Sequence, residues 1–115
     1  MTKNPPTEFL GLSPAEATRL LNKMSADDAF ALALTTHATE QMENRGLLVD
    51  DILHVLRQGF VYQAGEPTTR PGVFKYAIEG ATPNSGKRHI RVIVAMSETQ
   101  TNIARIITVM WVDKK

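Results

Sequence analysis

Cysteine is absent from this chain of 115 residues. A disulfide framework, a thiolate metal site and a cysteine nucleophile are therefore excluded, and the composition fits a reducing cytoplasm. The chain also has no uncharged apolar run of the ~18 residues that a membrane-spanning helix needs. Residues 1–11 are polar and contain proline, without the apolar core of a signal peptide. We therefore expect a cytoplasmic protein with neither a membrane segment nor a membrane partner.

A strong excess of charge is also missing, since the net charge of the whole chain is only +1. The charges are nevertheless unevenly distributed. Residues 1–58 hold five basic and eight acidic side chains, a net charge of −3, whereas residues 59–115 hold eight basic and four acidic ones, a net charge of +4. If a polyanion binds this protein, we expect the second half of the chain to contact it.

The first half of the chain carries helix signals. A serine cap, a proline at the first helical position and a glutamate three residues after the cap predict a helix over residues 14–24. A second serine followed by two aspartates predicts a long helix from about Ser25 to Arg45, where Gly46 ends it. A third helix is expected over residues 49–58.

The second half alternates between apolar and polar side chains, as strands do. Four strands are expected, over residues 60–64, 73–79, 88–96 and 102–112, with turn-forming segments between them. The sequence thus predicts a single α+β domain over residues 13–115, preceded by a flexible arm of residues 1–12. In this domain the helices pack on one face of a four-stranded antiparallel sheet.

The other face of this sheet is expected to be basic, with Lys75, His89, Arg91 and Arg105 on it. Cleavage of an RNA backbone needs a group that accepts the 2′-OH proton, a group that protonates the leaving oxygen, and cations beside the phosphate. His89 is the candidate for proton transfer, and the three cations are candidates for phosphate contacts, with no metal or cofactor required. The alternative is a solvated face with ordinary ion pairs, for example to Glu79.

Two residues near the strand ends extend this candidate set. Arg88 lies at the entry of the third strand and is a candidate substrate contact. Strand parity puts Trp111 on the same side as Arg105, where it would be a platform for stacking a base. The alternative for the tryptophan is ordinary packing.

On the long helix, His37, Gln41, Asn44 and Arg45 recur on one side. If this row meets the edge of the sheet, it could supply a second group for proton transfer or a group that binds an anion. Alternatively, Arg45 caps the last carbonyls of the helix and His37 is a histidine at the boundary of the core. His37 and Glu40 have the spacing of helical metal ligands, but no third ligand has a suitable spacing, and we expect no metal.

Several short segments, in this order and spacing, resemble the bacterial domain-of-unknown-function family 4258. They are residues 34–38 with a His-Ala pair, residues 42–47 with an Arg-Gly turn, residues 51–59, and Ile107-Thr108-Val109 in a strand. That family is similar in architecture to the RelE and ParE toxins, within a group of small ribonuclease folds that includes barnase and colicin-type nucleases. The resemblance implies helices packed on an antiparallel sheet and RNA cleavage at the open sheet face. It makes His37 and Arg45 the motif positions.

Three functions follow as hypotheses. The first is a metal-independent RNA-cleaving toxin of a toxin-antitoxin pair, with RNA, free or on the ribosome, as substrate and an antitoxin protein as partner. The second is a noncatalytic module of the same fold whose basic face binds a protein partner or nucleic acid. The third is an interaction module in which the first helix mediates a homodimer.

Overall fold

The computed structural model describes residues 11–83, 86, 88–97 and 99–112. The elements in this part of the chain are α1 (Pro14–Ser25), β1 (Ala31–Leu34), α2 (Thr36–Arg45), α3 (Val49–Gln58), β2 (Phe60–Val61), β3 (Glu66–Pro67), β4 (Phe74–Ala81), β5 (His89–Ser97) and β6 (Gln100–Val112). The expected helices over residues 14–24 and 49–58 are confirmed. Residues 1–10 of the expected arm lie outside the described residues.

Local capping explains where α1 and α3 begin. The Ser13 hydroxyl accepts a hydrogen bond from the Glu16 backbone N–H, and the Glu16 carboxylate accepts one from the Ser13 backbone N–H. This second bond lowers the pKa of Glu16, because it stabilises the charged form. At the start of α3, the buried Asp51 carboxylate accepts a hydrogen bond from the Leu48 N–H at 2.8 Å.

The long second helix expected from the sequence is wrong in its first half, where Ala31–Leu34 form β1 instead. This alternation of alanine and leucine suits either a helix or a strand. The strand forms because it pairs in parallel with β6, from Ala31 beside Ile103 to Leu34 beside Ile106. Thr35 then caps a new helix, since its hydroxyl accepts a hydrogen bond from the Ala38 N–H at 3.1 Å.

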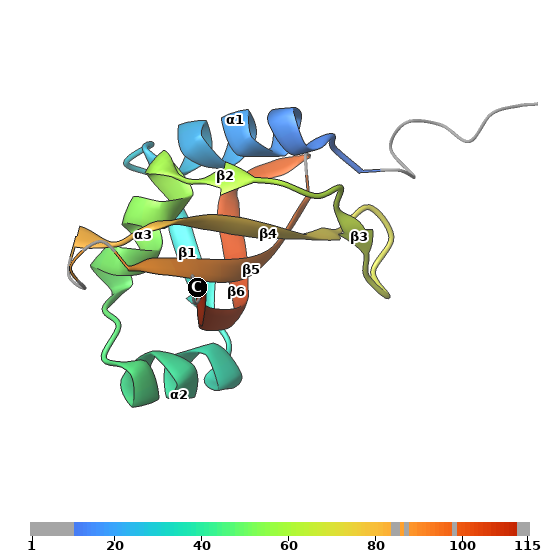
Figure 1. Cartoon of the computed structure of the whole chain (residues 1–115). Coiled ribbons are helices and arrows are strands. Elements are labelled where there is room, and N and C mark those ends of the chain that lie inside the picture. Colours follow the sequence, from blue (N-terminus) through green and yellow to red (C-terminus); the bar gives the residue numbers. More distant parts are fainter. Residues whose placement is uncertain (1–10, 84–85, 87, 98, 113–115) are drawn as a thin grey trace, which may run out of the picture.

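The predicted α+β class is confirmed, but the sheet is larger than four strands and is not wholly antiparallel. Its strand order is β1-β6-β5-β4-β2, and β3 pairs with β4 beside this path. The β1–β6 pair is parallel, whereas the other pairs are antiparallel. The sheet is therefore a meander of β4, β5 and β6 with short strands added at both edges (Figure 1).

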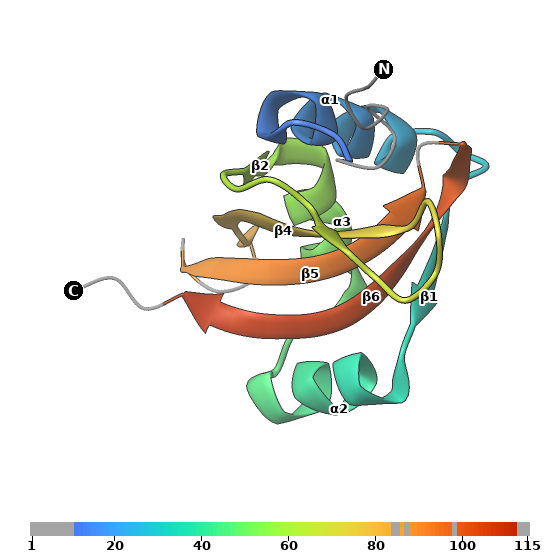
Figure 2. The same cartoon turned by 90° about the vertical axis from the view of Figure 1, so that its right-hand side faces the viewer.

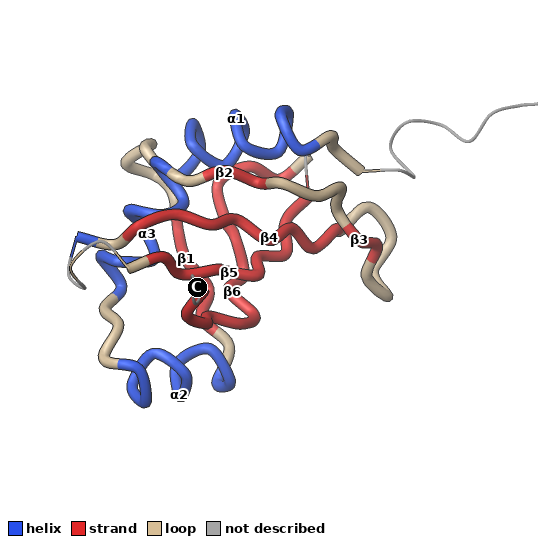
Figure 3. The backbone as a smooth tube through the Cα atoms, viewed as in Figure 1, coloured by secondary structure: helices blue, strands red, loops and turns tan. Residues whose placement is uncertain are grey.

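The helices lie on different sides of this curved sheet. Figure 2 looks onto the strands, with α3 behind them, α1 above and α2 below. Side-chain bonds join α1 to α3, since Asn22 donates to the Leu56 carbonyl at 2.7 Å and Arg57 donates to the Ser25 carbonyl at 2.9 Å. α2 packs separately against β6 (Figure 3). Among the described residues, no helix has both the length and the apolar character to cross a membrane.

A β-bulge in β6 reverses the alternation of its side chains. Ile93 of β5 pairs with Thr108, and the next residue, Val94, pairs with Ile106. Ile107 therefore has no partner on β5 and is the extra residue of the bulge. Before the bulge the even-numbered residues Ala104 and Ile106 are buried, and after it the odd-numbered Val109 is buried. Thr108 therefore lies on the opposite face of the sheet from Ile106, although the two are only two positions apart in the strand.

Candidate functional site

The face of the sheet turned away from α1 and α3, called the open face below, carries its side chains in rows across the strands. In one row Glu79 on β4 lies beside Arg91 on β5, which lies beside Met110 on β6. The next row holds Ala77, Ile93 and Thr108, and the row after that holds Lys75, Ala95 and Arg105. Two charged rows are therefore separated by a row of small or uncharged side chains.

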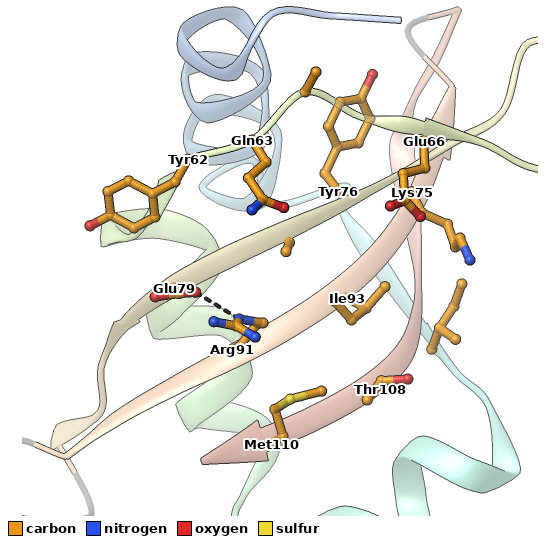
Figure 4. A pocket seen from close by; sticks show the side chains of 13 residues that line it. Tyr62, Gln63, Glu66, Lys75, Tyr76, Glu79, Arg91, Ile93, Thr108 and Met110 are labelled. Carbon is orange, nitrogen blue, oxygen red and sulfur yellow. Dashed lines mark hydrogen bonds and ion pairs between the residues drawn. The ribbon is translucent and has the colours of Figure 1, made fainter. Parts of the chain in front are cut away.

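An ion pair between Glu79 and Arg91 lies in a hollow of about 380 Å³ on this face. The Arg91 Nε donates to the Glu79 Oε2 at 2.6 Å, and the two side chains are 39% and 19% exposed. Tyr62 and Gln63, from the segment after β2, line the same hollow from above (Figure 4). A carboxylate that can accept a proton and a guanidinium that can contact a phosphate thus stand together where a ligand can enter.

The second charged row lies at the other end of the open face. Lys75 lies beside Glu66 on β3 and lines the first hollow. Arg105 is exposed and lines a neighbouring hollow of about 320 Å³ together with Arg70. Lys75 and Glu79 are four residues apart on one strand, which corresponds to ~13 Å at ~3.3 Å per residue. The open face can therefore contact more than one phosphate of an extended polyanion, and its two ends cannot both hold the same phosphate.

His89 extends the row pattern by one position. It lies between Ala81 and Val112 and is diagonal to Glu79 across β4 and β5. Its side chain is half-buried. Alternation puts it on the same side of β5 as Arg91, as the sequence predicted. His89 therefore lies on the same face as Glu79 and Arg91, one row further along the strands, although it is not among the residues that line the hollow.

His37 and Arg45 are not brought to the open face. His37 is exposed in the first turn of α2, and Arg45 lies in the last turn of the same helix. Neither residue is among those that line the two hollows. From the row predicted on this helix, Gln41 does reach the sheet, but it bonds to backbone, since its amide oxygen accepts a hydrogen bond from the Val109 N–H. The row predicted on this helix therefore meets the sheet at β6 through Gln41, and a role of His37 and Arg45 stays a prediction.

The predicted position of Trp111 is also wrong. The bulge at Ile107 moves Trp111 to the helix side of the sheet, where it lies beside the buried Ile90 and packs against the core. The guanidinium of Arg88 lies over its ring, 3.8 Å from the ring centroid. Arg88 therefore contacts Trp111 in this structure, and the tryptophan is not an exposed platform on the open face.

Two features of the site were missed or undervalued in the sequence. From the sequence Glu79 is only an ordinary ion-pair partner of an arginine, whereas the register pairs it with Arg91 in the lining of the hollow. No motif in the sequence distinguishes Phe60. The register pairs Phe60 with Glu79, while the next residue, Val61, is buried and pairs with Ile78. This alternation was readable from the sequence, but the pairing partner was not.

Among the described residues, no group of three histidine, aspartate or glutamate side chains is placed to hold a metal ion. With the geometry established, comparison with known proteins adds one finding. A family model described as a domain of unknown function, DUF4258, matches residues 34–111, from the last residue of β1 into the end of β6. A search of curated proteins and a search of solved structures each returned no match.

Proposed function

Given that the chain belongs to the DUF4258 family, whose description assigns no activity, we propose that it is a metal-independent endoribonuclease that cleaves RNA on the open face. One observation carries this proposal: a carboxylate and a guanidinium are joined at 2.6 Å in an accessible hollow, with a histidine one row away on the same face. Transfer of a phosphoryl group from one ribose oxygen to another needs these three kinds of group and no cofactor.

In the proposed reaction, Glu79 accepts the proton of a ribose 2′-OH, and the oxygen attacks the adjacent phosphorus. The bond from phosphorus to the 5′-oxygen breaks, and the leaving oxygen takes a proton from His89 in its imidazolium form. A 2′,3′-cyclic phosphate and a free 5′-OH result. Arg91 contacts the phosphate oxygens as their charge grows, which is where a positioned guanidinium lowers the barrier most.

For the biological role we propose a toxin of a toxin-antitoxin pair that acts on RNA, either free or on the ribosome, and is held inactive by an antitoxin protein. The support is the α+β architecture with an open antiparallel face, together with the resemblance of the family to RelE and ParE toxins. Lys75 and Arg105 then contact flanking phosphates, since they lie at the far end of the same face.

The experiment combines purified protein with a synthetic single-stranded RNA and maps the new ends. Induction in a bacterial host, with mapping of RNA 5′ ends and of growth, tests the toxin role. Glu79→Gln and His89→Ala should each lower cleavage by ~100-fold or more, the usual contribution of a general acid or base. Arg91→Ala should lower it by a similar factor, because it removes a group that stabilises charge in the transition state. Arg45→Ala is the matched control, because Arg45 lies off the open face, and it should keep full activity.

Defined ends from wild type that persist in Glu79→Gln would refute the assigned base. Loss of activity in Arg45→Ala, in a protein that still folds, would move the site to α2. New ends that carry a 5′-phosphate in place of a 5′-OH would refute the 2′-OH mechanism.

A noncatalytic role of the same face is the second candidate, and the ion pair itself favours it. Glu79 satisfies the charge of Arg91 in the free protein, and such a pair is also a stable surface feature. In this role the open face binds nucleic acid or an acidic protein through Lys75 and Arg105. Affinity that falls with salt while no RNA ends appear would support binding alone.

A further inference from the structure

Two large aromatic side chains stand exposed at one edge of the open face. Phe60 is 58% exposed and Tyr62 is 66% exposed. Their ring centroids are 6.4 Å apart, and the ring planes are inclined by 42°. At that separation and angle the two rings do not stack face to face, so their faces remain accessible to a third ring. Neighbouring exposed aromatic side chains are a common mark of a binding surface.

The backbone holds this pair beside the candidate reacting groups. Phe60 is directly opposite Glu79, and Val61 is buried behind it, so the Phe60 side chain is on the open face. Tyr62 lines the hollow of Glu79 and Arg91. Figure 4 shows Tyr62 above Glu79, at the end of the hollow that holds the ion pair. Gly59 permits this arrangement, because a Cβ there would lie 2.5 Å from the Glu79 carbonyl oxygen.

The surroundings of the pair include charged groups. The hollow beside Tyr62 holds the ion pair of Glu79 and Arg91 and is lined by Gln63 and by apolar residues such as Ile93 and Met110. A protein interface centred on two aromatic residues is expected to have an apolar, charge-depleted core around them. Proteins that bind single-stranded nucleic acids instead combine exposed aromatic side chains with nearby cations. The bases stack on the aromatic rings, and the phosphates contact the basic side chains.

We propose that Phe60 and Tyr62 form a base-binding subsite, on which one base of a single-stranded nucleic acid stacks while an adjacent phosphate meets Arg91. This inference rests on the proposed function for its substrate class and extends it. It assigns the substrate as single-stranded, because a base within a duplex has no free face to offer. It also gives the aromatic pair the role of positioning residues that present one phosphodiester to Glu79.

The test measures binding to a short single-stranded DNA, which has no 2′-OH and cannot be cleaved by the proposed reaction. A phosphodiester chain of the same length without bases is the second probe. Wild type should bind the DNA ~10-fold or more tightly than the base-free chain, since stacking on an aromatic side chain contributes ~1–3 kcal/mol per base. Phe60→Leu with Tyr62→Leu should remove this preference and leave the affinity for the base-free chain unchanged.

Leu48→Ala is the matched control. Leu48 is an exposed apolar residue, 55% exposed, at the start of α3 and outside the lining of the hollow. It should leave both affinities unchanged. Both aromatic side chains are exposed, so the leucine variants should melt at the temperature of wild type, which circular dichroism checks. Equal affinity of wild type for the two probes would overturn the proposal.

The two proposals fail in different ways. A base preference that the leucine variants lose, in a protein that never cleaves RNA, supports the subsite and refutes the ribonuclease. Cleavage of RNA with no base preference, at a rate that the leucine variants share, supports the ribonuclease and refutes the subsite. A dimer that the leucine variants convert to monomer, with unchanged affinity for DNA, would identify the pair as a self-association surface and refute the subsite.

Discussion

The side-chain amide oxygen of Gln41 accepts a hydrogen bond from the backbone N–H of Val109, with 2.7 Å between the two atoms. Gln41 lies on α2, and Val109 is the buried residue that follows the bulge in β6. A side chain of α2 therefore accepts the hydrogen bond of the backbone N–H that lies just beyond the bulge. This bond joins the element with the His-Ala segment to the strand that carries Arg105.

Replacing Gln41 by leucine should destabilise the protein by about 1–3 kcal/mol, because the Val109 N–H would be buried without an acceptor. Urea unfolding followed by circular dichroism measures this change. Asn44→Ala, at an exposed position of the same helix, is the control and should stay within ~0.5 kcal/mol of wild type. Equal stabilities of the two variants would show that the bond contributes nothing.

Gly59→Ala should destabilise the protein by about 1–3 kcal/mol, the usual range for overpacking. An added Cβ would lie 2.5 Å from the Glu79 carbonyl oxygen and 2.6 Å from that of Val55, both of which are backbone atoms. Because the clash falls between β2 and β4, the variant should also move Phe60 relative to Glu79 and lower affinity for the single-stranded DNA probe. Gly46→Ala is the comparison.

At Gly46 the added Cβ meets nothing within 4 Å, and the cost is the left-handed backbone with φ of 68°. That strain is worth ~1–2 kcal/mol. Gly46→Ala should therefore lose stability while it keeps the affinity for DNA. A Gly59→Ala protein with wild-type affinity would contradict the role of this glycine in placing Phe60.

The ion pair between Glu79 and Arg91 should matter more for function than for stability. Both side chains are partly exposed, and pairs of this kind contribute only ~0–1 kcal/mol. Arg91→Ala and Glu79→Gln should therefore unfold within about 1 kcal/mol of wild type, as chemical denaturation would show. A loss of several kcal/mol would identify the pair as structural, and lost activity in these variants would then say nothing about catalysis.

Trp111 should not respond directly to a ligand on the open face. It is the only tryptophan in the chain, and it packs on the helix side with Arg88 over its ring. Saturating single-stranded DNA should leave its fluorescence emission almost unchanged, whereas Arg88→Gln should alter it. Strong quenching by DNA in the wild type would show that Trp111 is part of the binding surface.

Much of the fold was readable from the sequence because the signals were local. The serine cap and proline before α1, and the aspartates in the first turn of α3, act within a few residues of themselves. The alternation in β4 and β5 correctly placed Lys75, His89 and Arg91 on one face, since neither strand contains a bulge. The family membership was also readable, from short segments whose order and spacing were characteristic.

The errors arose where distant residues decide the structure. A strand at Ala31–Leu34 exists because β6 supplies its partner from the other end of the chain, and periodicity within the segment carries no information on that pairing. The bulge at Ile107 reversed the parity on which the position of Trp111 had been predicted. With β1 interrupting the long helix, His37 and Arg45 lie on a short helix that packs against β6, and neither residue lines a hollow of the open face.

The sequence by itself determined the helix starts at residues 14 and 49, the α+β class and the placement of Lys75, His89 and Arg91 on one face of the sheet. Capping, strand alternation and charge are properties of neighbouring residues, and they need no knowledge of the partner strands. Only the tertiary structure decided that Glu79 meets Arg91 and that Phe60 stands beside them. Strand register, which sets these contacts, depends on pairing between segments and is absent from any one of them.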